Sequence, residues 1–377
     1  MNILVFSWRD PKHPTAGGAE QVMHEHMKGW AGAGHKVTLF SSRFTGGLLQ
    51  EKLDGVNIIR RGDQYIGVKI AGYLYRRNNK DKYDLVVDQF HGIPFFTPLY
   101  VAKKPILAVL QEVAKEVWFL NELPIPFNWL VGLLGYLFEP LIFLFYKKVP
   151  FMVGSNSAKT DLTKMGIAEN HITIVPHGVI VEKPNPMRGK EKIKTIVFLG
   201  ALTKDKGIEE ALKTFSILNR KGNFRFWVIG RGSPEYLKYL SFLCIKLNID
   251  NKVKFWGFVN QKKKFELLAR SYLLINPSVK EGWGLVNIEA NAVGTPVISY
   301  KSVGLIDSVK EGVSGLFSKE NNSVSLADKV WELSNNQKLY QRLQETSLIW
   351  SNNFSWSMSK KMSLQLLNRI VMINVNV

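Results

Sequence analysis

The stretch Glu281-Gly-Trp-Gly-Leu-Val-Asn-Ile-Glu289-Ala lies between two apolar segments, Tyr272–Ser278 and Gly294–Ser299. This order predicts a strand, a loop, a helix and a second strand. The two glycines of the loop allow backbone to approach a ligand closely. The helix expected over residues 285–293 presents unpaired N–H groups at its start, and these favour an anion such as a phosphate.

Two carboxylates stand eight residues apart in this stretch. Glu281 falls in the loop and Glu289 about two turns into the expected helix. Side chains so placed can reach different hydroxyl groups of one elongated ligand, as a sugar nucleotide would require. The alternative is a solvated loop charge and a charge on the helix surface.

Five short motifs in this order resemble the retaining glycosyltransferases with two Rossmann-like domains, the GT-B fold, and most closely those of family 4. Glu281 and Glu289 match the E-x7-E motif of that family. The other four motifs are Gly17-Gly18-Ala-Glu20, Gly200–Gly207, Val228–Gly232 and Phe255–Val259. The resemblance covers nearly the whole chain. It implies an α/β fold with two doubly wound parallel sheets facing each other across a cleft, and transfer of a sugar from a nucleotide-diphosphate sugar to an acceptor hydroxyl.

The resemblance also implies roles for particular residues. Glu281 would orient the transferred sugar, Lys206 would stabilise charge on the diphosphate, and Glu289 would hold the ribose. The departing phosphate is thought to assist the acceptor, so no separate base is required. The implied donor-binding residues are Gly17, Gly18, Gly200, Lys206, Arg231, Gly257, Phe258, Val259, Glu281, Gly282, Trp283, Gly284, Leu285, Val286 and Glu289. The chain has no D-x-D motif, so no metal ligand and no cofactor is expected beside a UDP- or GDP-linked sugar.

The chain departs from the family pattern at two places. Ala201 stands where an arginine usually follows the glycine, and Leu110-Gln111 stands where many relatives carry a histidine. His91, at the end of the preceding strand, could face the same cleft and is a third candidate catalytic residue beside Glu281 and Lys206. Two alternatives stay open: a non-catalytic sugar-nucleotide-binding relative, and a sugar-nucleotide epimerase of the same fold.

Composition fits a two-domain protein in a reducing compartment. A chain of 377 residues suits two domains of ordinary size. Its one cysteine, Cys244, excludes an internal disulfide framework and a multi-cysteine metal site, and we expect it to be buried in a helix.

The net charge of +19 favours anionic partners but does not choose among them. Residues 1–178 carry 20 Lys/Arg against 15 Asp/Glu, a net +5, and residues 179–377 carry 30 against 16, a net +14. We find no zinc finger, aromatic RNA-binding signature or basic-region heptads, so nucleic acid is not an expected partner.

Apolar runs alternating with helical segments predict parallel-sheet domains, which we place at residues 1–178 and 179–354. The resemblance implies that the first lies on the acceptor side and that the second binds the nucleotide sugar. Residues 179–193 would form the linker. A last helix, from Ser355 to about Ile373, resembles the family's final helix, which packs back on the first domain. The expected strands are Asn2–Trp8, Lys36–Ser41, Gly55–Ile59, Tyr83–Asp88, Pro105–Leu110, Phe151–Gly154, Ile172–Pro176, Thr195–Gly200, Phe224–Ile229, Lys252–Trp256 and Gly315–Phe317.

Two segments of the first domain suggest contact with a membrane. Residues 66–82 form an amphipathic pattern ending in Arg76, Arg77, Lys80 and Lys82, which could lie on anionic lipid. Residues 117–151 are strongly apolar, but Glu139-Pro140 argues against a spanning helix and favours a helix pair dipping into the interface. Ordinary buried helices are the alternative in both cases.

We find no signal segment at the start of the sequence. The expectation is therefore a cytoplasmic protein, peripheral on the inner face of the membrane, with a lipid-linked or cell-envelope glycan as acceptor.

Overall fold

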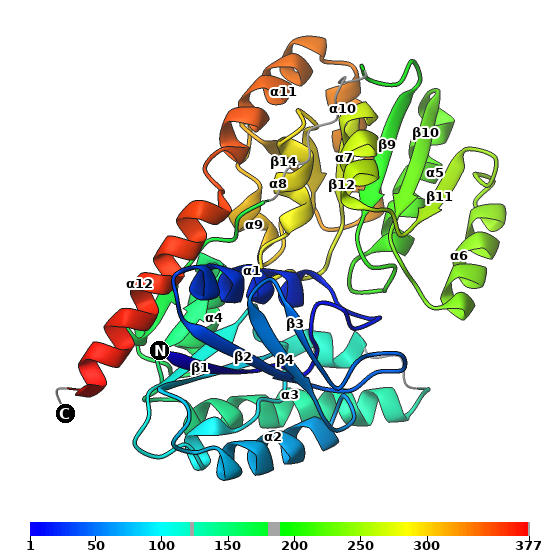
Figure 1. Cartoon of the computed structure of the whole chain (residues 1–377). Helices are drawn as coiled ribbons and strands as arrows, with labels where there is room; N and C mark the ends of the chain where they lie inside the picture. Colours follow the sequence, from blue (N-terminus) through cyan, green and yellow to red (C-terminus); the bar gives the residue numbers. More distant parts are fainter. Residues whose placement is uncertain (121–123, 180–188, 376–377) are drawn as a thin grey trace. The chain divides into compact units, whose positions relative to one another are not determined.

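The computed structural model describes residues 1–120, 124–179 and 189–375, which form two compact units. Unit 1 comprises Met1–Gly178 and Trp356–Val377, and unit 2 comprises Val179–Ser355 (Figure 1). The predicted linker, residues 179–193, falls largely on residues 180–188, which lie outside the described part of the chain.

Unit 1 is built on an eight-stranded sheet in the order β3-β4-β2-β1-β5-β6-β7-β8. Its neighbouring strands are parallel except β3 and β4, which pair antiparallel. The antiparallel edge strand was not predicted, because its sequence, Gln-Glu-Lys-Leu, carries no apolar run. The strands are β1 Asn2–Phe6, β2 Lys36–Ser41, β3 Gln50–Leu53, β4 Val56–Arg60, β5 Leu85–Phe90, β6 Ile106–Leu110, β7 Phe151–Val153 and β8 Ile172–Ile174.

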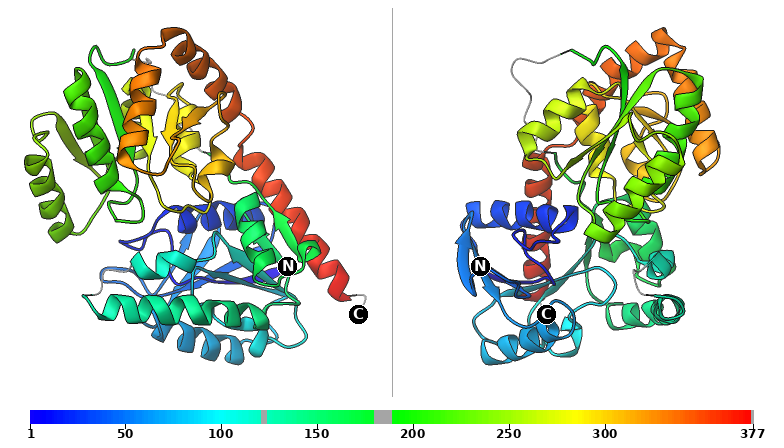
Figure 2. Two further views of the ribbon diagram at one scale, coloured as in Figure 1. Left: turned by 180° about the vertical axis from the view of Figure 1, so that it is seen from behind. Right: turned by 90° about the vertical axis from the view of Figure 1, so that its right-hand side faces the viewer.

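Helices cover both faces of this sheet. Met23 and Trp30 of one helix and Leu367 of another pack with Val5 and Leu39 on one face, whereas α2 and α3 contribute to the apolar clusters on the other. Figures 1 and 2 show this layering, with α1 and α2 on opposite sides of the sheet. The α-helices of unit 1 are α1 Gly18–Gly32, α2 Gly67–Asn78, α3 Phe127–Phe145, α4 Asn156–Lys164 and α12 Trp356–Val375; the 3-10 turns are η1 Thr97–Leu99, η2 Lys115–Leu120 and η3 Glu169–His171.

The helix α12 returns to unit 1, as the sequence predicts. It packs against α1, where Trp30 Nε1 donates to Ser363 Oγ at 3.0 Å and Lys360 pairs with Glu25. The C-terminal helix is therefore part of the hydrophobic core of unit 1.

Unit 2 is a six-stranded, all-parallel sheet in the order β11-β10-β9-β12-β13-β14. Cys244 is buried in the core on one face, as predicted, and burial raises the pKa of its thiol to about 11. The strands are β9 Lys194–Leu199, β10 Phe224–Ile229, β11 Val253–Gly257, β12 Leu273–Asn276, β13 Val297–Ser299 and β14 Gly315–Phe317; the helices are α5 Ile208–Lys221, α6 Pro234–Lys246, α7 Gln261–Arg270, α8 Leu285–Asn291, α9 Leu305–Ser308, α10 Ser323–Ser334 and α11 Gln337–Ser351.

The apolar segment 117–151 differs from its prediction. Its described residues form the end of η2 and one helix, α3, rather than a pair of α-helices. α3 is long and apolar enough to cross a membrane by length and composition. In the fold it lies along unit 1, because Glu139 turns inward and accepts hydrogen bonds from the Ala114 and Lys115 backbone N–H groups, both at 2.7 Å.

The outer side of α3 is apolar and exposed. Twelve of its 19 residues are exposed large apolar side chains: Phe127, Trp129, Leu130, Val131, Leu133, Leu134, Tyr136, Leu137, Phe138, Leu141, Leu144 and Phe145. On the same side of the sheet, α2 and its N-cap expose Ile66, Ile70, Tyr73 and Leu74. One residue of the predicted basic end of this helix is not at the surface. Arg76 is only 3% exposed, because it faces the core beside Tyr83 and Tyr100. Arg77, Lys80 and Lys82 are exposed.

Candidate functional site

Glu281 and Lys206 meet at one edge of the unit 2 sheet. Glu281 lies in the loop between β12 and α8, and Lys206 in the turn between β9 and α5. Lys206 Nζ lies 3.0 Å from Glu281 Oε2 and 3.5 Å from Asp205 Oδ2. The other carboxylate oxygen, Glu281 Oε1, accepts a hydrogen bond from Ser278 Oγ at 3.0 Å. The pair is about one fifth exposed, so it can still reach a ligand.

Two glycines allow the backbone to close around this pair. Gly207 has a φ of 74°, and a Cβ there would come within 2.2 Å of the Pro277 carbonyl oxygen. Gly304 has a φ of 82°, and its Cβ would lie 1.8 Å from the Glu281 carbonyl oxygen. Any side chain at either position would displace the loop that carries Glu281.

Glu289 lies on α8 and has a different cationic partner. Its carboxylate forms an ion pair with Lys264 of α7, and both side chains are mostly buried. Lys264 was not predicted, because one lysine in the run Lys262-Lys263-Lys264 carries no distinguishing signal. The structure thus gives each motif carboxylate its own lysine.

A series of buried side-chain hydrogen bonds stabilises the loop that carries Glu281. Asn276 Nδ2 donates to Asn287 Oδ1 and Asn287 Nδ2 donates to Ser308 Oγ, each at 2.9 Å. These residues connect the end of β12 to α8 and α9. They were missed by sequence reasoning, although an asparagine ending the apolar run of β12 is the signal that could have revealed them.

The remaining predicted residues of unit 2 follow the ends of adjacent parallel strands. Gly200 follows β9, Arg231 follows β10, and Gly257 ends β11. Because parallel strands end at the same edge of a sheet, these positions lie at the edge where β12 leads to Glu281. Arg231 stacks on the exposed Phe258 ring, with its Cζ 3.9 Å from the ring centroid, and Val259 follows.

The predicted residues around the start of α8 differ in their exposure to solvent. The Trp283 side chain is buried against Phe354, with ring centroids 4.8 Å apart. Gly284 is the N-cap of α8 in a left-handed conformation, and Gly282, Leu285 and Val286 are partly exposed.

In unit 1, Gly17 and Gly18 begin α1. The Gly17 N–H donates to Glu20 Oε2 at 2.7 Å, and Glu20 also accepts from Trp8 Nε1 and pairs with Arg9. This glycine loop is therefore tied to the end of β1.

The third predicted catalytic residue, His91, follows β5. Its Nδ1 lies 3.9 Å from Glu112 Oε1, and its side chain is about one third exposed. Of the two residues standing at the family's usual histidine, Leu110 is buried in β6 and Gln111 Oε1 lies 2.7 Å from Nε2 of His177. Burial lowers the pKa of His177 to about 4, so its ring is neutral near pH 7. His177 was not a predicted site residue.

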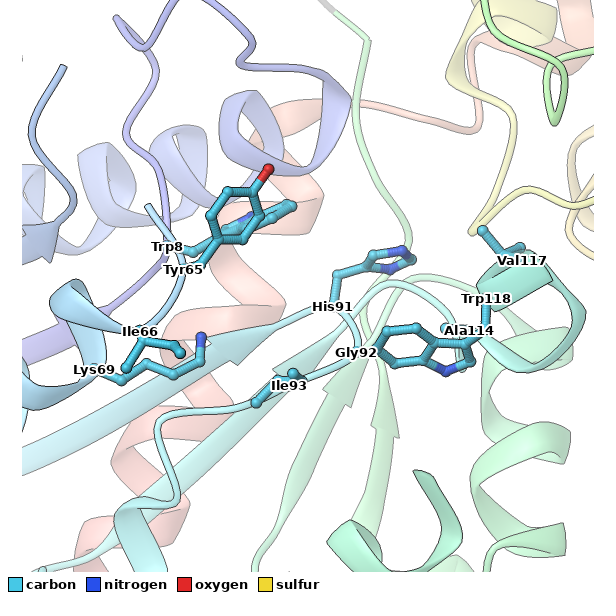
Figure 3. A pocket seen from close by; sticks show the side chains of 10 residues that line it. All are labelled: Trp8, Tyr65, Ile66, Lys69, His91, Gly92, Ile93, Ala114, Val117 and Trp118. Carbon is cyan, nitrogen blue, oxygen red and sulfur yellow. The ribbon is translucent and has the colours of Figure 1, made fainter. Parts of the chain in front are cut away.

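His91 also lines a pocket of about 280 Å³ that lies wholly within unit 1. Figure 3 shows Trp8 and Tyr65 on one side, Val117 and Trp118 on the other, and the His91 ring between them. The pocket is lined by Trp8, Tyr65, Ile66, Lys69, His91, Gly92, Ile93, Ala114, Val117 and Trp118. Apolar and aromatic side chains dominate it, which is typical of sites for organic ligands.

Sequence comparison finds two family models that together match residues 16–348. The model described as Glycosyltransferase Family 4 matches residues 16–183, and the one described as Glycosyl transferases group 1 matches residues 181–348. A capsular polysaccharide biosynthesis glycosyltransferase of Staphylococcus aureus is 29% identical over 214 residues, covering 50% of this chain and 53% of that protein. The aligned part of the chain spans between 34% and 58% of the length of four such curated relatives.

Solved structures share the fold at low sequence identity. Sucrose-phosphate synthase of Thermosynechococcus elongatus superposes with a TM-score of 0.81 at 17% identity, covering 99% of each chain. The Anabaena protein HepE, solved in complex with UDP-glucose, gives a TM-score of 0.72 at 17% identity, covering 98% of this chain and 100% of that one. The two parallel-sheet units therefore have the GT-B fold.

Proposed function

The chain belongs to the family 4 glycosyltransferases of the group 1 type, and from this premise we propose that it transfers a sugar from a nucleoside diphosphate to an acceptor hydroxyl with retention of configuration. The observation that carries the proposal is the 3.0 Å pair of Lys206 and Glu281 at the sheet edge where four neighbouring strands end. A solved neighbour was crystallised with UDP-glucose, which supports a nucleotide sugar as donor.

In this proposal the donor separates the resting ion pair. The diphosphate draws Lys206 away from Glu281 and Asp205, and the freed Glu281 carboxylate accepts hydrogen bonds from hydroxyl groups of the sugar. Glu289 accepts hydrogen bonds from the ribose hydroxyl groups, and these bonds replace part of its contact with Lys264. As the bond between the anomeric carbon and the phosphate oxygen breaks, Lys206 stabilises the charge developing on the phosphate.

The acceptor step follows from what the family resemblance implies. The acceptor oxygen bonds to the anomeric carbon, and its proton passes to an oxygen of the departing phosphate, so that atoms and charge balance. Arg231 and Phe258 would hold the base, and His91 would contact the acceptor. No metal or cofactor is part of this proposal.

Thermal stability against free UDP, GDP and ADP tests the donor site. A nucleotide at about a hundred times its dissociation constant adds roughly 2.7 kcal/mol to the free energy of unfolding. We expect one of the three to stabilise the parent chain and to do so less in Glu289→Ala. Glu266→Ala is the matched control, because Glu266 lies on α7 and pairs with Arg270 and Lys263 rather than with site residues. No stabilisation by any nucleotide would contradict the proposal.

Two rival functions give different products. A non-catalytic relative would bind the nucleotide sugar but release no nucleoside diphosphate in the presence of any acceptor. An epimerase would convert the donor sugar without an acceptor. Analysis of nucleotide and sugar products after incubation with each UDP- or GDP-sugar separates these outcomes.

We further propose that unit 1 binds the anionic inner face of the membrane and that the acceptor is a lipid-linked or cell-envelope glycan. The exposed apolar side of α3 is the main support, and the exposed Arg77, Lys80, Lys82, Lys147 and Lys148 lie beyond the ends of α2 and α3 or in their last turn. Such basic residues favour anionic lipid at about 1 kcal/mol each near the surface. The relative involved in capsular polysaccharide synthesis is consistent with an envelope glycan.

Flotation with liposomes tests the membrane surface. We expect the parent chain to float with acidic liposomes, and Leu137→Glu combined with Leu141→Glu to abolish flotation. Phe242→Glu is the matched control, because Phe242 is exposed on α6 of unit 2. Equal flotation of the α3 variant and the Phe242→Glu control, or no flotation of the parent chain, would contradict membrane binding through α3.

A further inference from the structure

The pocket of unit 1 combines apolar walls with one cationic side chain. Lys69 enters it from α2, and Figure 3 shows its nitrogen turned toward the space between Tyr65 and Ile93. The Lys69 amine has only weak interactions with its neighbours. The Lys69 nitrogen lies 5.1 Å from the centroid of the Phe95 ring, and among the residues that the structure describes no acidic side chain forms an ion pair with it.

The carboxylate of Asp88 attracts Lys69 electrostatically but already has its own hydrogen-bond partners. Asp88 is fully buried and accepts hydrogen bonds from Tyr146 Oη at 2.5 Å, Thr97 Oγ1 at 2.8 Å and the backbone N–H groups of Phe95 and Thr97. It attracts Lys69 only through space, and burial lowers the pKa of the Lys69 amine despite that attraction. A protonated amine in such a place is stabilised by an anion that enters the pocket.

The aromatic walls add a second requirement for the ligand. Trp8, Tyr65 and Trp118 provide ring surfaces, against which apolar chains or the faces of sugar rings pack. His91 can donate or accept a hydrogen bond at the centre. A small inorganic anion would leave these walls in contact with water.

We propose that this pocket binds the acceptor through an anionic group, a phosphate, held beside Lys69, with the acceptor's apolar or ring-shaped part against Trp8, Tyr65 and Trp118. This inference rests on the proposed transferase function and narrows its acceptor to a phosphate-bearing amphiphile or sugar. The phosphate can belong to a lipid or to a soluble sugar phosphate, and both present the same group to Lys69.

The position of the pocket relates it to the apolar side of α3. Trp118 packs on Gly135 of α3 so closely that a Cβ at Gly135 would lie 2.3 Å from the indole. Ile66 lines the pocket and is 70% exposed on the outer side of α2. A lipid whose chain contacts α3 would therefore bring its phosphate to the same side of unit 1 as Lys69.

Calorimetric titration of the full chain, without donor, tests the inference. The probes are a short-chain prenyl monophosphate, the matching neutral prenyl alcohol, a hexose monophosphate and inorganic phosphate. Lys69→Met removes the charge and keeps the apolar stem, whereas Lys69→Arg keeps the charge. Lys164→Met is the control, because Lys164 is exposed on α4, away from the pocket.

We expect the parent chain to bind one organic phosphate at least about tenfold more tightly than Lys69→Met does, which corresponds to the loss of one charge-assisted hydrogen bond. Lys69→Arg should retain most of the affinity and Lys164→Met all of it. Binding of the prenyl phosphate identifies a lipid source, and binding of the hexose phosphate alone identifies a soluble one.

Equal affinity of the parent and Lys69→Met for every phosphate, or no binding of any organic phosphate, would overturn the inference. If Lys69→Met does not fold, the test compares the affinities of the parent chain for prenyl phosphate and prenyl alcohol. Tighter binding of the phosphate supports the inference, and equal binding of the two ligands overturns it. Nucleotide stabilisation, measured on the same samples, depends on unit 2 residues. It therefore shows separately whether the proposed transferase function fails.

Discussion

Each unit places a lysine at its candidate ligand site, but the two surround that lysine differently. In unit 2, Lys206 lies within 3.5 Å of two carboxylates and is a preformed member of a charged group. In unit 1, Lys69 lines an apolar, aromatic pocket next to exposed apolar helices. The difference supports our proposal that unit 2 binds a compact, highly charged ligand and unit 1 an amphiphilic one.

The contrast extends to the titratable residues. All seven histidines, at positions 13, 24, 26, 35, 91, 171 and 177, belong to unit 1, whereas unit 2, residues 179–355, has 27 of the 50 Lys and Arg side chains. Unit 1 also has a buried ion pair in which both Arg60 and Asp10 are at most 1% exposed. Stability of unit 1 should therefore depend on buried ionisable groups more than stability of unit 2.

The largest expected effect concerns this buried pair. Burial alone would raise the pKa of Asp10, but hydrogen bonds from Arg60 and from the Lys12 N–H hold that pKa below its usual value. Asp10→Asn leaves Arg60 with Glu51 as its remaining acidic partner, and we expect it to lower the free energy of unfolding of unit 1 by about 3 kcal/mol. Hydrogen exchange of unit 1 peptides, followed by mass spectrometry, measures the change.

An exposed pair in unit 2 serves as the comparison for that measurement. Lys221 and Asp328 lie 2.7 Å apart on the surface. Asp328→Asn should change the stability of unit 2 by less than about 1 kcal/mol. Similar effects of the two substitutions would contradict the distinction between the units.

The next effect is on turnover. Lys206→Met should reduce the rate of sugar transfer about a hundredfold while the chain stays folded, because the variant lacks the cation that we propose stabilises the departing phosphate. Steady-state release of nucleoside diphosphate measures this rate. Lys204→Met, two residues away and exposed, is expected to retain the parent rate. A Lys206→Met rate equal to that of this control would exclude Lys206 from the reaction.

The smallest effect appears in the pH dependence of unit 1. Burial lowers the pKa of His26 to about 3, helped by His177 and Lys360, whereas an unfolded histidine titrates near pH 6.5. Between these values the unfolded chain binds more protons, so stability falls as pH decreases from about 6.5 toward 3. The loss from this residue at pH 5 is about 2 kcal/mol.

His26→Leu should remove that part of the acid sensitivity. Among the described residues neither ring nitrogen of His26 has a hydrogen-bond partner, and the ring packs between Trp30 and Trp356. Hydrogen exchange of unit 1 at pH 5 and pH 7 should therefore differ less in the variant than in the parent. An unchanged difference would assign the acid sensitivity to other groups. Unit 2 peptides should show the same difference between pH 5 and pH 7 in both chains.

Sequence reasoning captured the regular parts of the fold. The predicted strand Lys36–Ser41 is β2 and the predicted Gly315–Phe317 is β14, because buried parallel strands are continuous apolar runs. The edge strand β3 was missed because its polar residues pair through backbone alone. Arg76 was expected at an exposed helix end, and its burial depends on tertiary contacts that no local pattern reveals.

For the site, motif spacing led to Glu281 and Lys206, and the structure brings them to 3.0 Å. Their supports, Lys264 and the Asn276–Asn287–Ser308 chain, come from separate elements and became visible only in the folded structure. The same holds for Lys69. Among the described residues Lys69 forms no ion pair, and this is a property of the packing around α2, not of its sequence neighbours.

The inward orientation of Glu139 would limit how deeply α3 enters a bilayer in the membrane-bound state that we propose. Two backbone N–H groups and the Trp118 indole bind its carboxylate, so that one side of α3 stays anchored to unit 1. Only the outer half of a helix about 10 Å wide can then sink into lipid, roughly 5 Å below the headgroups. If unit 1 binds a membrane as proposed, α3 at that depth would leave the acyl interior undisturbed.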